Sequence, residues 1–239
     1  LFQGLKIMDA GEKYLSHMGK YPVISISLKS MKQYSYDLAY DMLTKAVESE
    51  YSRHWKQIEA SGALTDAKLE RYLRIRDLKG TESDYADSLK FLSECLYACT
   101  GQRSIILIDE YDVPLENAYF SGFYDRMVAL IRSLFESALK TNDNLEFAVV
   151  TGCLRISKES IFTGLNNLKI MSITSKTYAE HFGFTPEEVE QMLQDYGLEE
   201  NLETVKKWYD GYRFGEAEVY NPWSVINYVD SCYKNKNAF

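Results

Sequence analysis

Apolar residues form two kinds of pattern along this chain, and together they predict a sheet packed with helices. Residues 23–28 alternate apolar and polar side chains, which is typical of a strand with one buried face. Residues 105–108 form a continuous apolar run, which predicts a strand covered on both faces, as in a parallel sheet. Residues 145–150 predict a further strand, and the shorter apolar run at 170–173 predicts another.

Between these runs, apolar residues recur at helical spacing. The spacing predicts helices over residues 35–60, 85–96 and 127–138. The charged stretch 64–79 also has helical spacing, and its many charges indicate a surface insertion. The order of strand, helices, strand, helix and strand predicts a parallel sheet with right-handed crossovers.

The last quarter of the chain is expected to be all-helical from about Thr177. Thr185 and Glu188 form a capping-box pattern, with Pro186 at the first helical position. Apolar stripes then predict three helices in succession: the first ends at Gly197, the second runs through 202–208, and an Asn-Pro pair at 221–222 caps the third.

Two carboxylates, Asp109 and Glu110, directly follow the continuous apolar run. Ligands of parallel sheets bind outside the carboxyl ends of the strands, so these acids are expected at a metal or nucleotide site. The run has the form of a Walker B strand, with an aspartate for Mg²⁺ and a glutamate that polarises the attacking water. The usual phosphate loop, G-x-x-x-x-G-K-[ST], is absent from the sequence.

Three further residues are candidates for the same site. Thr151 ends the neighbouring predicted strand and can contact a γ-phosphate or the water; a plain Thr-Gly turn is the alternative. Arg155 can reach a phosphate as a bidentate donor, and a solvent-facing arginine is the alternative. Asp112 adds a third carboxylate, which leaves open a clustered metal site of the nuclease or phosphatase type.

Composition narrows the classes of function. The 239 residues, 46% of them hydrophobic, suffice for one large domain, or for one domain with a small appendage. A net charge of −8 without a basic stripe disfavours nucleic-acid binding by this segment. No apolar run approaches the ~18 residues of a membrane span, and no signal peptide opens the chain. The four cysteines lack zinc spacing, so we expect free thiols and a cytoplasmic location.

Four segments, in this order, resemble the bacterial AAA-ATPase-like domain family: residues 108–115, 151–167, 208–214 and 220–224. The resemblance implies a three-layer α/β core of the P-loop NTPase type over residues 1–176, without its first strand and phosphate loop. It implies a helical lid over residues 177–239. Members of the family usually carry a C-terminal PD-(D/E)xK nuclease-like domain, so nucleic acid is expected as a partner only through such a domain.

The resemblance also implies roles for individual residues. Asp109 would bind the metal and Glu110 would activate water. For an ATPase of this architecture we also expect Thr151 and Arg155, by their positions after the neighbouring strand, to sense the γ-phosphate. We therefore expect Mg²⁺ and ATP as cofactors of the intact protein, ATP hydrolysis as its reaction, and an inactive fragment when residues 1–239 stand alone.

A different class of function stays open beside this one. The fold could serve as a non-catalytic regulatory or protein-interaction module, in which the aromatic-rich part recognises a partner. Segment 208–214 is a packed turn that joins the helical part to the rest, or else a lid segment near the adenine or an inter-domain contact. A homo-oligomer or a protein partner fits either class.

Overall fold

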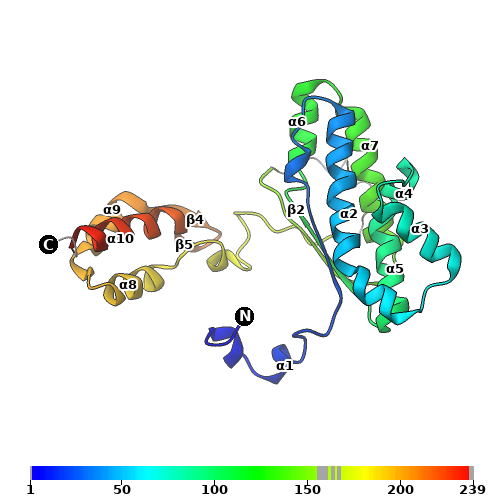
Figure 1. Ribbon diagram of the computed structural model, residues 1–239. Coiled ribbons are helices and arrows are strands. Elements are labelled where there is room, and N and C mark those ends of the chain that lie inside the picture. The colour runs from blue at the N-terminus through cyan, green and yellow to red at the C-terminus, as the bar shows by residue number, and fades with distance from the viewer. Residues whose placement is uncertain (1, 155–160, 163–164, 166–167, 237–239) are drawn as a thin grey trace. The chain divides into compact units, whose positions relative to one another are not determined.

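Three parallel strands in the order β1-β2-β3 form the sheet of the first of two units, residues 1–166 and 167–239, into which the chain divides. The strands are β1 (Val23–Ser27), β2 (Ser104–Asp109) and β3 (Leu145–Val150), so all three lie where the sequence predicted them. The computed structural model describes residues 2–154, 161–162, 165 and 168–236. Figure 1 shows the elements.

The helices of the first unit follow the predicted pattern in part: the helix predicted over 85–96 is divided between α4 and α5, and α6 was not predicted. The long helix predicted over residues 35–60 is confirmed as α2, and the helix predicted near residues 127–138 is α7 continued by a π-helical turn. The elements of this unit, besides the strands, are η1 (Lys6–Asp9), α1 (Glu12–Leu15), η2 (Lys29–Met31), α2 (Tyr36–Ser61), α3 (Asp66–Arg76), α4 (Glu82–Ala86), α5 (Ser88–Thr100), α6 (Val113–Ser121), α7 (Tyr124–Phe135) and η3 (Glu136–Lys140).

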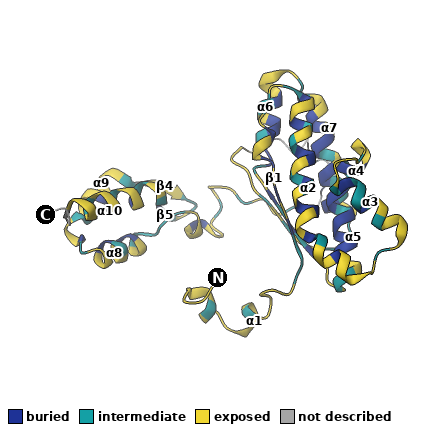
Figure 2. Ribbon diagram, in the orientation of Figure 1, coloured by how far each residue is buried: buried dark blue, intermediate teal, exposed yellow. Residues whose placement is uncertain are grey.

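Both crossover connections place their helices on the same face of the sheet. The strands are neighbours in space in the order in which they occur in sequence, so two right-handed crossovers run in one direction. The side chains that point into this helical layer are almost completely buried: Ile24, Ile26, Ile106 and Ile108. Figure 2 shows buried residues along α2, α5 and α7, the helices of this layer.

The opposite face of the sheet, which we call the open face, has no helix over it in the described part of the first unit. Phe147 is 59% exposed and Val149 39% exposed, and Ile105 and Leu107 beside them are half-buried. The three-layer arrangement predicted from the apolar run is therefore incomplete here. The helices of right-handed crossovers cover both faces of a sheet only where the strand order reverses, and the order β1-β2-β3 does not.

Side chains of α2 close the outer edge of β1. Glu50 Oε1 accepts a hydrogen bond from the backbone N–H of Ser25 at 2.7 Å, and Arg53 donates to the carbonyl of Val23. His54 Nε2 lies 3.1 Å from the same carbonyl. These contacts satisfy backbone groups that an edge strand otherwise offers to another chain. Among the described residues, no side chain closes the outer edge of β3 in this way.

The charged stretch 64–79 is a packed helix, and its interpretation as a surface insertion was wrong. Helix α3 buries Tyr72 and Ile75 completely. The ring of Tyr72 lies 4.7 Å from that of Tyr51 between centroids, and its hydroxyl donates to the Tyr51 carbonyl at 2.6 Å. The helix therefore contributes to the core of the unit.

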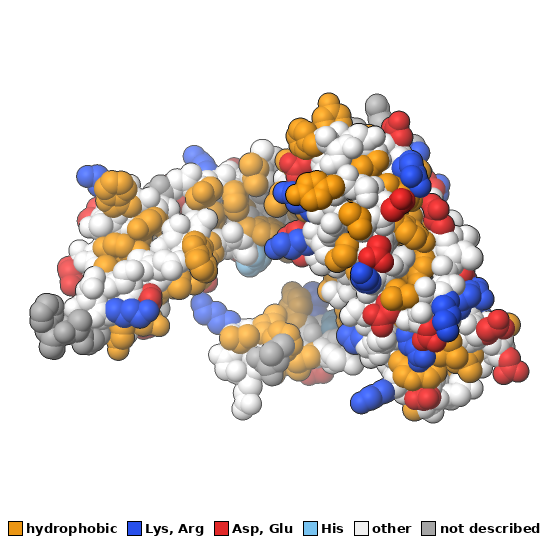
Figure 3. Space-filling model, turned by 45° about the horizontal axis from the view of Figure 1, so that its top comes forward, with side chains coloured by type: hydrophobic (Ala, Val, Ile, Leu, Met, Phe, Trp, Pro, Cys, Tyr) orange, Lys and Arg blue, Asp and Glu red, His pale blue; other side chains and the backbone are white. Residues whose placement is uncertain are grey.

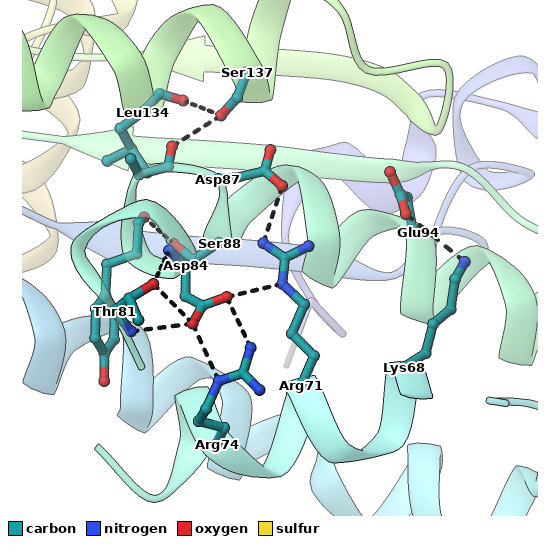
Figure 4. A network of polar contacts seen from close by, with 12 residues as sticks. Lys68, Arg71, Arg74, Thr81, Asp84, Asp87, Ser88, Glu94, Leu134 and Ser137 are labelled. Carbon is teal, nitrogen blue, oxygen red and sulfur yellow. Dashed lines mark hydrogen bonds and ion pairs between the residues drawn. The ribbon is translucent and has the colours of Figure 1, made fainter. Parts of the chain in front are cut away.

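The charged residues of α3 form a network with the next two helices (Figure 4). Asp84 accepts hydrogen bonds from Arg71 Nε at 3.1 Å, from Arg74 Nε at 3.2 Å and from the Thr81 N–H at 3.0 Å. Arg71 also donates to Asp87 at 3.1 Å. Burial alone would raise the pKa of Asp84, but the bonds from Arg74, Thr81 and Arg71 hold it well below its usual range.

The second unit combines helices with a small hairpin, so the expectation of an all-helical segment was wrong. β4 and β5 pair antiparallel around Gly215, whose φ is +55°, as a two-residue turn requires. The capping box of Thr185 and Glu188 is confirmed at the start of α8. The elements are η4 (Ala179–His181), α8 (Pro186–Asp195), η5 (Glu199–Asn201), α9 (Leu202–Tyr209), β4 (Asp210–Phe214), β5 (Ala217–Tyr220) and α10 (Pro222–Lys236).

Residues 170–173 form no strand, contrary to the prediction. The Ile173 carbonyl instead accepts a hydrogen bond from the Gly215 N–H at 2.7 Å, which ties this segment to the hairpin of the second unit. Across the described part of the chain, no helix is both long enough and apolar enough to cross a bilayer.

The Glu50 carboxylate at the closed edge of the sheet makes the stability of the fold depend on pH. Burial alone would raise the pKa of its carboxyl, but hydrogen bonds from His54, Arg53 and the Ser25 N–H lower it from 4.5 to about 2. Because the folded pKa lies below the ordinary one, the carboxylate stabilises the fold above pH 4.5, and this contribution is lost as the pH falls toward 2.

Glu50→Gln should therefore lower the free energy of unfolding by roughly 3 kcal/mol at pH 7. In urea denaturation at pH 3, the difference between wild type and variant should fall to about half or less. Glu59→Gln, an exposed change on the same helix, should have little effect at either pH. An equal loss for Glu50→Gln at both pH values would contradict the assigned contacts.

Candidate functional site

The carboxyl ends of the three strands place a row of polar side chains on the open face. In the parallel register Ser27 pairs with Asp109, and Thr151 is the residue that follows β3 beside Asp109. The Thr151 hydroxyl donates a hydrogen bond to Asp109 Oδ1. All three residues are exposed, so a ligand can reach them from the open face.

Glu110 leaves the strand in an unusual backbone conformation. Its φ is +54°, in the left-handed region that residues with a side chain enter at a cost of about 1–2 kcal/mol. Backbone strain of this kind concentrates at functional sites. The Glu110 carboxylate is 30% exposed and lies 3.9 Å from Lys29 Nζ.

Lys29 is a residue of this site that the sequence reasoning missed. It follows β1 by two residues, in η2, and brings a positive charge to the same edge of the sheet. The signal was available, because the rule that directs attention to the carboxyl ends of parallel strands applies to β1 as well as to β2.

Hydrogen bonds continue past the ends of β2 and β3 and join the loops that follow them. The Thr151 N–H donates to the Ile108 carbonyl at 2.9 Å, and the Tyr111 N–H donates to the Thr151 carbonyl at 3.0 Å. The backbone of Thr151 is therefore held on both sides by the segment that carries the two acids. Its hydroxyl is placed on Asp109 by the pairing of the strands.

Asp112 lies apart from the exposed row. It is 2% exposed, and its Oδ2 accepts hydrogen bonds from the N–H groups of Cys153 at 3.0 Å and Leu154 at 2.6 Å. Within the described residues, no group of three or more His, Cys, Asp or Glu side chains could hold a metal ion. The arrangement therefore gives no support to the clustered-carboxylate alternative.

Asp109 is the exposed carboxylate of the row, and its chemistry suits a hard cation. Mg²⁺ binds oxygen ligands and commonly takes only one or two protein carboxylates, completing its shell with water and substrate phosphates. The Asp109 carboxylate, with the Thr151 hydroxyl beside it, fits that mode of binding. Arg155, the remaining predicted site residue, lies outside the described residues.

The aromatic-rich segment 208–214 crosses from α9 into β4. Tyr209 packs on Tyr228 of α10, with ring centroids 5.5 Å apart, whereas Trp208 is 71% exposed. A hollow of about 370 Å³ in this unit is lined by Tyr209, Trp223, Ser224, Asn227, Tyr228 and Ser231. The segment is thus in part a packed junction, as one of the alternatives predicted.

The fold is that of an α/β protein with a parallel three-stranded sheet, and its candidate site lies at the carboxyl edge of that sheet. The chain belongs to the family described as "Predicted AAA-ATPase", which matches residues 1–162 and so includes all three strands and the exposed row. The family resemblance of the sequence is thereby confirmed, and the nuclease-like domain stays a prediction.

One curated relative shares part of this chain. The "Uncharacterized protein in vnfD 5'region" of Azotobacter chroococcum mcd 1 is 30% identical over 131 residues, which make up 54% of this chain and 25% of the relative. The matched region thus spans about a quarter of the relative's length. No solved structure matches the chain.

The strain at Glu110 can be measured through stability. Glu110→Gly should give a higher free energy of unfolding than Glu110→Ala by about 1 kcal/mol, because glycine adopts a positive φ without steric cost. The same pair of changes at Glu116, an exposed position inside α6, should show the reverse order by a similar amount. Urea denaturation of the four variants checks this, and an alanine variant at position 110 as stable as the glycine variant would exclude the strain.

Proposed function

We propose that the intact protein binds Mg-ATP and hydrolyses it at the carboxyl edge of the β1-β2-β3 sheet. The observation that carries the proposal is the position of Asp109, which is exposed at the tip of a buried strand with the Thr151 hydroxyl on its carboxylate. Membership of a family described as predicted AAA-ATPases supports the same reaction.

Each residue of the row has a chemical task in this proposal. Asp109 holds Mg²⁺ directly or through water, and Glu110 orients the water that attacks the γ-phosphate. Thr151 orients the Asp109 carboxylate or contacts the γ-phosphate, and Arg155 donates to the phosphate. A lid role for residues 177–239 stays a separate part of the proposal.

The phosphate loop is absent from this sequence. A further strand that carries a phosphate loop fits at the open edge of β3. A strand added there lies beside the Asp109–Thr151 pair, and a helix returning over the open face covers Phe147 and Val149. The strand order then reverses at β3, and ligands of α/β sheets bind at such a reversal. This added strand is part of the proposal for the intact protein. The relative extends well beyond the region it shares with this chain, which is a quarter of its length.

The charges on the helical layer of the first unit do not favour nucleic acid as a ligand of that face. Figure 3 shows basic and acidic side chains interspersed over the visible helical layer, with no basic patch on that face. Nucleotide is therefore the proposed ligand of this region. Nucleic acid enters only through a separate nuclease-like domain.

The open face also favours a second candidate function. Exposed apolar side chains at Phe147 and Val149 are typical of a surface that another protein segment covers. The unit can then serve as a regulatory or interaction module on the NTPase fold, without hydrolysis. Measurement of ATP turnover separates the two candidates.

Glu110→Gln in the intact protein should lower the kcat of ATP hydrolysis by about 100-fold or more, because the amide cannot accept the proton of the attacking water. Glu116→Gln removes an exposed carboxylate on the neighbouring helix and should leave kcat unchanged. Steady-state phosphate release with Mg²⁺ measures both. Unchanged hydrolysis by Glu110→Gln would remove Glu110 from the mechanism.

Residues 1–239 alone should bind Mg-ATP only weakly, with a Kd above about 1 mM. The reason is that the backbone amides and lysine of a phosphate loop supply most of the grip on the phosphates, and the sequence contains no such loop. Titration calorimetry tests this, with the intact protein as the comparison. Micromolar binding by residues 1–239 would show that they hold a complete nucleotide site.

A further inference from the structure

Asp112 begins α6 without capping it. An aspartate at the N-cap usually accepts a hydrogen bond from an N–H of the first helical turn through its side chain. Here the backbone carbonyl of Asp112 accepts from the N–H groups of Leu115 and Glu116, and the side chain makes no capping bond. The carboxylate is directed elsewhere.

Its target is the loop that follows β3. Oδ2 accepts from the N–H groups of Cys153 and Leu154, at 3.0 and 2.6 Å. The neighbouring Tyr111 hydroxyl donates to the Leu154 carbonyl at 2.8 Å. Tyr111 and Asp112, two consecutive residues after β2, therefore bind the backbone of residues 153–154, which follow Thr151 and Gly152.

The fit between the two loops is close. A Cβ on Gly152 would lie 2.6 Å from Asp112 Oδ1 and 2.6 Å from the Tyr111 ring, so only glycine fits there without displacing them. The Tyr111 ring is itself fixed, because it packs against Phe162 and Phe135 with centroid distances of 5.2 and 6.4 Å.

Burial of the Asp112 carboxylate in this arrangement lowers the stability of the fold. Its buried Oδ1 has no hydrogen-bond partner among the described residues, and an unsatisfied buried acceptor is destabilising. The N–H groups of Cys153 and Leu154 and the positive end of α6 offset part of that cost. A residue that only stabilised its own helix would use its carboxylate as a cap instead.

We propose that Asp112 is a positioning residue: by binding the backbone of residues 153–154, it holds Thr151 on Asp109 in the orientation that the metal site needs. This inference rests on the proposed function, because Mg-ATP hydrolysis is the reaction it serves. Asp112 itself touches neither nucleotide nor metal. Its effect reaches the site through Gly152 and the backbone of Thr151.

Amide hydrogen exchange in the intact protein tests the contact itself. Asp112→Ala should speed exchange at the Cys153 and Leu154 amides by about tenfold or more, whereas Asp112→Asn keeps one acceptor oxygen and should show a smaller change. Asp143→Ala, an exposed change just before β3, should leave these amides unaffected. Unchanged exchange in Asp112→Ala would overturn the proposal.

Steady-state kinetics of the same variants test the positioning role. Asp112→Ala should lower kcat for ATP by about 10- to 100-fold, with KM for Mg-ATP within about twofold of wild type. Asp112→Asn should restore most of kcat. Gly152→Ala, which displaces the carboxylate without removing it, should reproduce the loss.

These outcomes separate positioning from a purely structural role. Loss of folded protein lowers kcat in proportion to the inactive fraction, so rates are normalised to folded protein measured by urea denaturation. A kcat per folded molecule equal to that of wild type in both Asp112→Ala and Gly152→Ala would overturn the proposal. If Asp112→Ala does not fold, the kcat values of Asp112→Asn and Gly152→Ala are the test. Absence of ATP hydrolysis by the wild-type intact protein would overturn both the proposed function and the kinetic role of Asp112. The hydrogen-exchange rates would still show whether Asp112 binds the backbone of residues 153–154.

Discussion

The parallel pairing of β2 with β3 is the interaction on which the candidate site depends. Ile106 and Ile108 are buried under the helices, and their register with β3 determines which residue stands beside Asp109. Pairing continues through the Thr151 N–H and carbonyl, so the core and the site are one hydrogen-bonded structure. A site built on strand ends is therefore as rigid as the sheet that carries it.

The two edges of the sheet differ in how readily a further strand could pair with them. Glu50 satisfies the outward Ser25 N–H, and Arg53 and His54 lie on the outward Val23 carbonyl, so a further strand cannot pair with these two groups without displacing them. The outer edge of β3 carries no such protection in the described residues, and the exposed side chains of Phe147 and Val149 adjoin it. In the proposal for the intact protein, an added strand and its cover therefore fit beside β3, which is also the side next to Thr151.

Much of this architecture could be predicted from local patterns, because strands and helices depend on residues close in sequence. The run 105–108 gave a strand and placed Asp109 at its tip, and α2 followed from its apolar spacing. The same run could not show that the open face lacks cover, since apolar character records what a strand can bury and not which segment covers it. Charge likewise concealed the buried side of α3, where Tyr72 and Ile75 alternate with arginines.

The residues that sequence reasoning could not place are those whose role depends on a contact between loops far apart in the chain. Locally, Asp112 has the pattern of a metal ligand or a helix cap, and the structure uses it for neither. Its partners, the N–H groups of Cys153 and Leu154, have no side-chain signature at all, because any residue except proline supplies the same donor. Gly152 is the one position where the contact affects the choice of residue, since the close approach of Asp112 excludes a Cβ there. A glycine after a strand-ending threonine therefore had two explanations, a turn or a close approach, and only the fold distinguishes them.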